Sequence, residues 1–397
     1  MHSETKVKVK AVSQEWDNTY QGLSWWKSDT IQQAKVMVVG AGALGNEVLK
    51  NLTLLNVGQI LIVDYDHIEY SNLSRSVLFR EKDTKRKALK AEVAAERIRE
   101  INKNVKVQFI NGDVTIDVGL GVFRRMDVII GCLDNRLARL FLNRMCFNVG
   151  KTWIDGAIEN LIGQVNVYQP PNTCYECSLT KQEWKGISAK LGCPTVIQRN
   201  LTFGRIPTTP ISASIVAAIQ TQEALKVVCD NQKNIMLDSF YYEGMNNLVL
   251  QLAPAKLKDD CQSHIFFEEI IEAPLSSTST ISETLNWLEE YFKNKDFYIK
   301  LDNAVALKVV ARETDKSYEV TIPKLKLTKD LMKEFQEEGH EEIYIVEETD
   351  EIDYSFKHPE KKLGDLGIPF LHIMRVYSEG NLFYVELSND EKFLKFS

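Results

Sequence analysis

A glycine-rich turn, Gly40-Ala41-Gly42-Ala43-Leu44-Gly45, constrains the fold of this chain more than any other feature of its sequence. It follows a short run rich in valine at residues 36–39 and precedes residues 44–57, where apolar side chains recur at helical spacing. Between a strand and a helix, the pattern G-x-G-x-x-G presents backbone N–H groups and a helix N-terminus to phosphate oxygens. The turn therefore predicts a strand, a phosphate-binding site and a helix, in that order.

Strand and helix patterns continue to alternate after this turn. Strands are predicted at residues 60–63, 105–110 and 128–130, helices at 88–101 and 138–149, a strand pair at 153–168, and an apolar helix at 212–228. Such alternation is typical of a doubly wound, mostly parallel, Rossmann-like α/β sheet. The intervening residues 170–210 are polar and rich in turn formers, which predicts a long crossover loop of the kind that is functional or mobile.

The character of the sequence changes after His264. Residues 276–280 are all serine or threonine and predict a linker, and Thr280 with Glu283 resembles a capping box that opens a helix at residues 283–292. Strand patterns follow at 297–301, 318–322 and 343–346, and the acidic stretch at 334–353 is interpreted as a solvated face. We therefore predict an N-terminal extension (1–30), a nucleotide-binding domain (31–270) and a small C-terminal α+β domain (281–397).

The overall composition excludes some classes of function. A net charge of −7 and a pI near 5.6 argue against a general nucleic-acid-binding protein. No apolar run approaches the length of a membrane span, and the start of the chain lacks the apolar core of a signal peptide, so a cytoplasmic location without membrane contact is expected. In that setting, the seven cysteines are better interpreted as metal ligands, a nucleophile and core residues than as disulfides.

The residues that follow the second predicted strand distinguish between two kinds of nucleotide. Asp64 ends that strand, where a carboxylate can accept hydrogen bonds from the ribose of either NAD or ATP. Adenylyl transfer also requires cations on the triphosphate and a carboxylate for magnesium. Arg75 and Lys87 are candidates for the cations, and Asp134 is the candidate for Mg²⁺. A dehydrogenase requires none of these three, so the set favours ATP.

Several motifs in this order resemble the ubiquitin-activating enzymes and the ThiF- and MoeB-type enzymes that adenylate sulfur-carrier proteins for thiamin and molybdopterin synthesis. The resemblance covers most of residues 30–265 and is carried by GAGALGNEVLKNL, VDYDHIEYSNLSR, KRKALKAE, GCLDNRLAR and EALK. It implies an adenylation domain in which Asp64 binds the ribose, Asp134 binds Mg²⁺, and the phosphates are bound by Asn72, Arg75 and Lys87. The nucleotide contacts implied in full are Gly40, Gly42, Gly45, Asp64, Asp66, Asn72, Arg75, Lys87, Asp134 and Asn135.

The chain departs from the resembled family at two positions. Many relatives have glutamine after the motif arginine, where this chain has Ser76. Many homodimeric relatives also contribute an N-terminal arginine to the ATP of the partner subunit, but no arginine precedes Arg75 here. Lys27 is the candidate substitute.

Two pairs of residues have the spacing of metal ligands. Cys174 and Cys177 form a C-x-x-C pair, which in the resembled family is the first half of a zinc site. The second half there is another C-x-x-C, whereas this chain has Cys261 and His264 at the corresponding place. Three thiolates and a neutral imidazole bind Zn²⁺ tetrahedrally, so a Cys₃His zinc site is predicted.

The remaining cysteines include a candidate nucleophile. In the resembled family the crossover segment carries the catalytic cysteine, and Cys193 lies in that segment here. Cys229, at the end of a predicted helix, is the second choice. Cys132 and Cys146 lie in apolar patterns and are interpreted as core residues.

The resemblance implies ATP-dependent activation of a ubiquitin-like protein. The enzyme would adenylate the C-terminal carboxylate, form a thioester on Cys193 and transfer it to a conjugating enzyme recruited by the C-terminal domain. The closest likeness is to the compact bacterial activating enzymes of ubiquitin-like conjugation operons, and a homodimer is expected. Three alternatives stay open: a sulfur-carrier adenylyltransferase, a non-catalytic scaffold subunit of an activating enzyme, and an NAD-dependent oxidoreductase.

Overall fold

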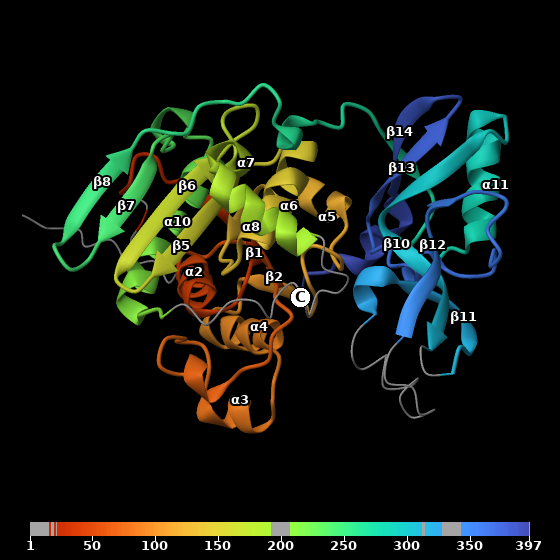
Figure 1. Ribbon diagram of the computed structural model, residues 1–397. Coiled ribbons are helices and arrows are strands. Elements are labelled where there is room, and N and C mark those ends of the chain that lie inside the picture. The colour runs from red at the N-terminus through yellow and green to blue at the C-terminus, as the bar shows by residue number, and fades with distance from the viewer. Residues whose placement is uncertain are drawn as a thin grey trace, which may run out of the picture.

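The chain folds into two domains that lie side by side (Figure 1). The computed structural model describes residues 16, 20, 22–191, 207–311, 314–327 and 343–396. An eight-stranded sheet forms the first domain, in the order β3-β2-β1-β4-β5-β6-β7-β8, and a six-stranded sheet forms the second. The doubly wound, mostly parallel α/β fold and the C-terminal sheet domain predicted from the sequence are both confirmed.

The first sheet is parallel at its centre and antiparallel at one side. Its strands are β1 (Lys35–Val39), β2 (Gln59–Val63), β3 (Lys106–Ile110), β4 (Val128–Gly131), β5 (Trp153–Glu159), β6 (Ile162–Tyr168), β7 (Ser239–Glu243) and β8 (Leu248–Leu252). Parallel pairing joins β3, β2, β1, β4 and β5, and antiparallel pairing joins β5 to β8. After the polar first residues of β1 and β2, the central strands are apolar and buried because helices cover both of their faces.

Alternate side chains of β1 face two separate helical layers. The helices of this domain are α1 (Ser28–Gln33), α2 (Ala43–Leu54), α3 (Glu81–Lys85), α4 (Lys90–Ile101), α5 (Leu120–Arg124), α6 (Arg136–Asn148), α7 (Tyr175–Ser178), α8 (Lys181–Leu191) and α10 (Pro210–Val228), with 3₁₀ turns η2 (Tyr70–Asn72), η3 (Gln232–Asn234) and η4 (Gln262–His264). Val36 and Val38 pack into the core formed with α2, α4 and α10, whereas Met37 and Val39 pack into the core formed with α5 and α6. None of the helices described is both long and apolar enough to cross a bilayer.

The predicted crossover loop is partly helical. Its first part contains α7 and α8, and α10 begins at Pro210 after Thr209, whose side-chain oxygen accepts the N–H of Ser212 at 3.2 Å. The sequence gives little sign of these two helices. α7 has only four residues, and α8 mixes polar and apolar residues without a wide apolar stripe. Residues 192–206, which include Cys193, lie outside the described residues.

The second domain begins earlier in the chain than the serine- and threonine-rich segment. Its elements are β9 (Ile270–Ala273), α11 (Ile281–Phe292), β10 (Phe297–Ala311), β11 (Ser317–Pro323), η5 (Lys324–Lys326), β12 (Ile343–Ile352), η6 (Leu363–Leu366), β13 (Ile373–Ser378), β14 (Asn381–Leu387) and η7 (Ser388–Phe393). β9 pairs in parallel with β14, and the predicted linker is itself bound to this domain, because Ser277 N–H donates to Asp390 at 2.8 Å. The capping box of Thr280 and Glu283 is present at the start of α11.

The two domains share a core and a buried ion-pair cluster. Leu371 and Ile373 of the second domain pack into the apolar layer of α5 and α6. Glu386 of β14 is fully buried and accepts from Arg124 at 2.8 Å and from Arg125 at 2.5 Å. A buried carboxylate requires such partners to offset its desolvation. The second domain is therefore bound firmly to α5.

Two glycines allow the backbones of the two domains to touch. Gly121 N–H donates to the carbonyl of Leu371 at 2.8 Å. A Cβ on Gly121 would lie 2.5 Å from that carbonyl oxygen, and a Cβ on Gly119 would lie 2.3 Å from the carbonyl oxygen of Phe370. Because backbone atoms cannot rotate away as a flexible side chain can, any larger residue at these positions would separate the domains.

This contact predicts the effect of adding one methyl group. Gly121→Ala should destabilise the protein by about 1–3 kcal/mol, because the new Cβ overlaps the Leu371 carbonyl. Gly186→Ala is the matched control, since a Cβ on this exposed glycine of α8 meets no atom within 4 Å. The midpoint of thermal unfolding measures the difference. Equal midpoints for the two variants would contradict a tight interdomain contact.

Candidate functional site

The glycine turn lies at the carboxyl end of β1, in the centre of the sheet. Gly40 has a φ of +96°, and a Cβ there would lie 2.4 Å from the carbonyl oxygen of Cys132. A Cβ on Gly45 would lie 1.9 Å from the carbonyl oxygen of Gly40. A Cβ on Gly42, in contrast, would meet no atom within 4 Å. The first and third glycines thus allow close packing, and the second leaves the start of α2 open to a phosphate group.

Asp64 lies beside this turn at the carboxyl end of β2. Its two carboxylate oxygens accept the N–H of Ala41 at 2.6 Å and the N–H of Asp66 at 2.8 Å. Burial raises the pKa of Asp64, and the charge of Lys90 partly offsets this rise. Each oxygen keeps a further lone pair, so the carboxylate is suited to accept hydrogen bonds from ribose hydroxyls. Asp66 is ion-paired with Lys90 at 2.7 Å.

Asn72 is the last residue of η2, and Arg75 follows that turn. The side-chain oxygen of buried Asn72 accepts the N–H of Glu69 at 2.9 Å, which holds the 3₁₀ turn. The half-buried Arg75 donates from Nη1 to the carbonyl of Ser71 at 2.8 Å. A guanidinium has five N–H donors, so one such bond leaves Arg75 able to bind an anion.

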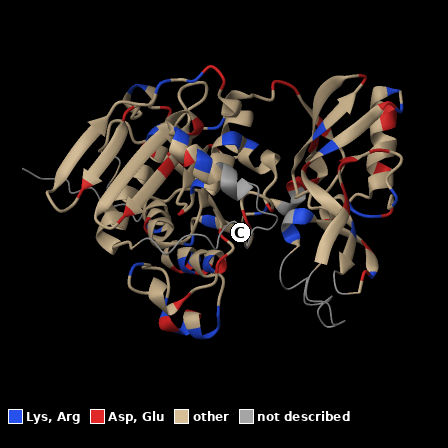
Figure 2. Ribbon diagram, viewed as in Figure 1, with Lys and Arg blue, Asp and Glu red and all other residues tan. Residues whose placement is uncertain are grey.

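Lys87 is exposed in the turn between α3 and α4, and α4 begins at Lys90, two residues later than the helix predicted from residue 88. Its backbone has a positive φ of 50°. Basic and acidic residues alternate around α3 (Figure 2), where Arg86 pairs with Glu96 at 3.0 Å.

Asp134 and Asn135 follow β4 and have different local roles. Asn135 caps α6, because its side-chain oxygen accepts the N–H of Ala138 at 2.7 Å. Asp134 is exposed. Burial raises the pKa of Tyr65, and so do the charges of nearby carboxylates, namely Asp66, Asp113, Asp134 and Asp64. Acidic side chains that follow β2, β3 and β4 therefore act on one phenol at the carboxyl edge of the sheet.

Arg139 is a residue of this site that the sequence reasoning missed, and its side chain is 12% exposed. Its guanidinium donates to Asp155 at 2.9 Å, to the carbonyl of Leu133 at 2.6 Å and to the carbonyl of Gly156 at 3.0 Å. These bonds fix the loop that carries Asp134. The sequence did contain a signal for Arg139, because it lies one helical turn after the capping residue Asn135. Side chains on a helix tilt toward its N-terminus, so the Arg139 side chain is directed back to the loop.

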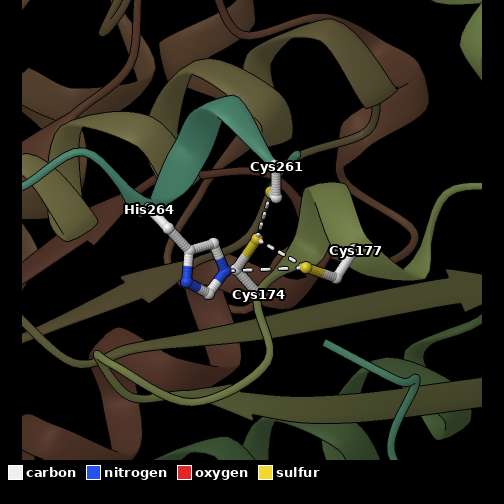
Figure 3. A group of neighbouring side chains, drawn as sticks. All are labelled: Cys174, Cys177, Cys261 and His264. Carbon is white, nitrogen blue, oxygen red and sulfur yellow. Dashed lines mark hydrogen bonds between the residues drawn. The ribbon is translucent and has the colours of Figure 1, made fainter. Parts of the chain in front are cut away.

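The predicted metal ligands come together from two distant parts of the chain (Figure 3). Cys174 immediately precedes α7 and Cys177 lies within it, whereas Cys261 immediately precedes η4 and His264 is its last residue. The Sγ of Cys174 lies 3.7 Å from that of Cys177 and 3.5 Å from that of Cys261, and the Sγ of Cys177 lies 3.5 Å from Nε2 of His264. All four ligand atoms lie within 4.8 Å of one another.

These distances fit a tetrahedral ion. Bonds of about 2.3 Å to sulfur and about 2.0 Å to nitrogen place neighbouring sulfurs about 3.8 Å apart, and sulfur and nitrogen about 3.5 Å apart. Burial raises the pKa of the Cys174 and Cys261 thiols and lowers the pKa of His264. Binding a cation would therefore release protons from the thiols, and low pH would weaken it.

A partly buried ion pair supports both halves of this cluster. Glu176 of α7 accepts two bonds from Arg144 of α6, at 3.0 and 3.1 Å. It also accepts the hydroxyl of Ser263 in η4 at 2.6 Å. Glu176 thus ties α7 and η4 together through contacts separate from the four candidate ligands.

Three other cysteines are packed in the protein. Cys146 and Cys229 are at most 1% exposed, which makes Cys229 inaccessible as a nucleophile in this conformation. Cys132 contacts the glycine turn, and burial raises the pKa of its thiol. The described residues resume at Pro207, after the stretch that contains Cys193. The carbonyl of Pro207 accepts the N–H of Asn160 at 2.7 Å. That contact lies in the turn between β5 and β6.

Comparison with known proteins identifies relatives of the first domain. Residues 21–263 match the ThiF family. The sulfur carrier protein adenylyltransferase of Thermus thermophilus is 32% identical over 223 residues, which cover 55% of this chain and 77% of that protein. SUMO-activating enzyme subunit 2 of Dictyostelium discoideum is 36% identical over 168 residues, which cover 42% of this chain. The matched stretch spans a quarter (25%) of the length of that subunit.

A solved structure is also similar to this chain. It is that of MccB from E. coli with succinimide, which is 23% identical, has a TM-score of 0.49, and is matched over 59% of this chain and 68% of MccB.

The Cys/His cluster predicts a bound metal ion. Purified protein should contain about one zinc per chain, and Cys177→Ser should lose both the zinc and thermal stability, because the ion joins α7 to η4. Cys146→Ala, which removes a buried thiol of α6 outside the cluster, is the control and should keep the metal. Elemental analysis and thermal unfolding measure the two effects. Equal zinc contents in the two variants would remove the cluster as a metal site.

Proposed function

Because this chain belongs to the ThiF family, we propose that it uses ATP to adenylate the C-terminal carboxylate of a ubiquitin-like or sulfur-carrier protein. The observation that carries this proposal is the open glycine turn beside Asp64 at the carboxyl edge of the sheet. The motif residues Arg75, Lys87 and Asp134 come from segments that follow β2 and β4 at the same edge. An NAD-dependent oxidoreductase would leave these three without a role.

Each motif residue has a proposed task in the reaction. Asp64 accepts the ribose hydroxyls, and Gly42 with the first N–H groups of α2 binds phosphate oxygens. Arg75 and Lys87 neutralise the triphosphate, and Asn72 completes the phosphate contacts. Asp134 would hold Mg²⁺, which supplies further positive charge to the phosphates.

The proposed chemistry forms one bond and breaks one. A carboxylate oxygen of the partner attacks the α-phosphorus of ATP, and the bond from that phosphorus to the bridging oxygen breaks, which releases pyrophosphate. The acyl-adenylate is a mixed carboxylic–phosphoric anhydride, which makes its acyl carbon reactive toward nucleophiles. Since the carboxylate and the triphosphate are both anions, catalysis rests on their alignment and on the neutralisation of charge by Arg75 and Lys87.

A surface on the first domain favours a protein as the substrate. The edge strand β8 exposes Leu248, Val249, Leu250 and Leu252, each by at least 40%. Grouped apolar side chains of this kind mark surfaces that bind other proteins. A second subunit is also part of the proposal, since closed twofold dimers are the commonest soluble oligomers. Lys27 is the candidate residue that would contact the ATP bound by the second subunit, and it is exposed immediately before α1.

We further propose that the Cys193 thiolate attacks the acyl carbon of the adenylate, so that a thioester forms while the bond from that carbon to the phosphate oxygen breaks and AMP leaves. The thioester then passes to a conjugating enzyme bound at the second domain. The second candidate is sulfur transfer, in which the adenylate is thiolated instead. It is favoured by the similarity to the Thermus thermophilus adenylyltransferase, most of whose length is matched. A non-catalytic scaffold is disfavoured, because a scaffold has no need for the set of Asp64, Arg75, Lys87 and Asp134.

Adenylation predicts exchange of radioactive pyrophosphate into ATP only when a ubiquitin-like partner is present. Asp134→Ala should lower the exchange rate at least about a hundredfold, since the proposed magnesium ligand is lost. Asp296→Ala, at an exposed aspartate of the second domain, is the matched control and should exchange like the wild type. Reduction of NAD without any pyrophosphate exchange would refute the adenylation reaction. A fully active Asp134→Ala enzyme would refute the role of Asp134 as a magnesium ligand.

Thioester formation predicts a separate result for the cysteines. Cys193→Ala should keep partner-dependent exchange but form no covalent species with the partner, because other residues bind the adenylate. The wild type and Cys229→Ala should both form a species on a non-reducing gel that added thiol removes. If the wild type accumulates adenylate that only a sulfur donor consumes, sulfur transfer is the correct function.

A further inference from the structure

Asn46 forms a buried junction between the glycine turn and a second backbone segment. It lies in the first turns of α2 and is 0% exposed. Its Nδ2 donates to the carbonyl of Ala41 at 2.7 Å and to the carbonyl of Gly42 at 3.0 Å. Its Oδ1 accepts the N–H of Leu78 at 2.8 Å. The side chain thus connects the turn to a segment 32 residues further along the chain.

The orientation of this amide is fixed by its neighbours. Carbonyl oxygens only accept and a backbone N–H only donates, so only one placement of the amide satisfies all three. Asparagine is a poor helix former, and a buried amide without partners costs free energy. A small apolar residue would suit a helix better, so the three bonds account for the presence of asparagine at this position.

The two segments joined by Asn46 are those proposed to bind phosphate. Ala41 is held from both sides, because its N–H donates to Asp64 at 2.6 Å and its carbonyl accepts from Asn46. Leu78 is 2% exposed and lies three residues after Arg75. Its burial anchors the segment, and the bond to Asn46 sets the distance of that segment from the glycine turn.

We infer that Asn46 is a positioning residue that aligns the Arg75 segment with the phosphate-binding turn. This inference rests on the proposed ATP site, and it adds a residue that touches neither the nucleotide nor the partner. Because Asn46 acts on the phosphate contacts, its loss should weaken binding of the triphosphate. The ribose contact of Asp64 comes from a separate strand end, so binding of the nucleoside should change little.

The experiment compares two ligands, ATP and adenosine, by calorimetry on the full chain. Asn46→Ala should raise the Kd for ATP about tenfold and leave the Kd for adenosine within about twofold. Asn46→Ser should behave in the same way, since its hydroxyl is too short to bridge the turn and Leu78. Asn51→Ala, at a half-buried asparagine on the same helix, is the matched control and should bind both ligands like the wild type.

A double-mutant cycle tests whether Asn46 acts through Arg75. In an Arg75→Ala background, Asn46→Ala should raise the Kd for ATP no more than about twofold, because the aligned cation is already absent. Fully additive effects, or an equal loss of ATP and adenosine binding, would overturn the inference. Wild-type protein that binds ATP with this dependence on Asn46 but catalyses no exchange would refute the proposed function alone. Wild-type protein that binds no ATP would overturn both.

Discussion

The close approach of the glycine turn to the end of β4 is the constraint on which the nucleotide site depends. Gly40 can lie against the Cys132 carbonyl only because it has no Cβ, and Gly45 allows α2 to pack on the turn for the same reason. With the turn held there, the ends of β1, β2 and β4 meet. Asp64 reaches the N–H of Ala41, and the loop of Asp134 starts beside it. A methyl group at either glycine would separate these segments.

The core of the first domain could be predicted from the sequence because its signals are local. The uninterrupted apolar run of β1 and the helical spacing of α2 and α4 depend on burial within a few residues. Strands β7 and β8 were missed. Four of the five residues of β8 are apolar and all five are exposed, so apolar and polar residues do not alternate along it. Strand β9 was missed because its only pairing among the described strands is with β14, more than a hundred residues later in the chain.

The candidate site was predictable where residue type decides the chemistry. Cysteine and histidine at this spacing are typical zinc ligands, and the four predicted side chains do meet. Asparagine is ambiguous in comparison, because the same amide can bind a ligand or cap a turn. Asn72 and Asn135 were assigned to the nucleotide, yet each holds a local backbone N–H. Arg139 and Asn46 were overlooked because most of their partners are backbone groups, and residue types in the sequence do not identify which backbone groups a side chain will reach.

The firm attachment of the second domain has a consequence for what counts as a folding unit. The stretch that matches the ThiF family ends at residue 263, before Leu371 and Ile373 complete the apolar layer over α5 and α6. A fragment cut at that point would expose this layer to water and leave Arg124 and Arg125 without the buried carboxylate. The boundary of homology is therefore not a boundary of cooperative folding, and such a fragment is expected to aggregate.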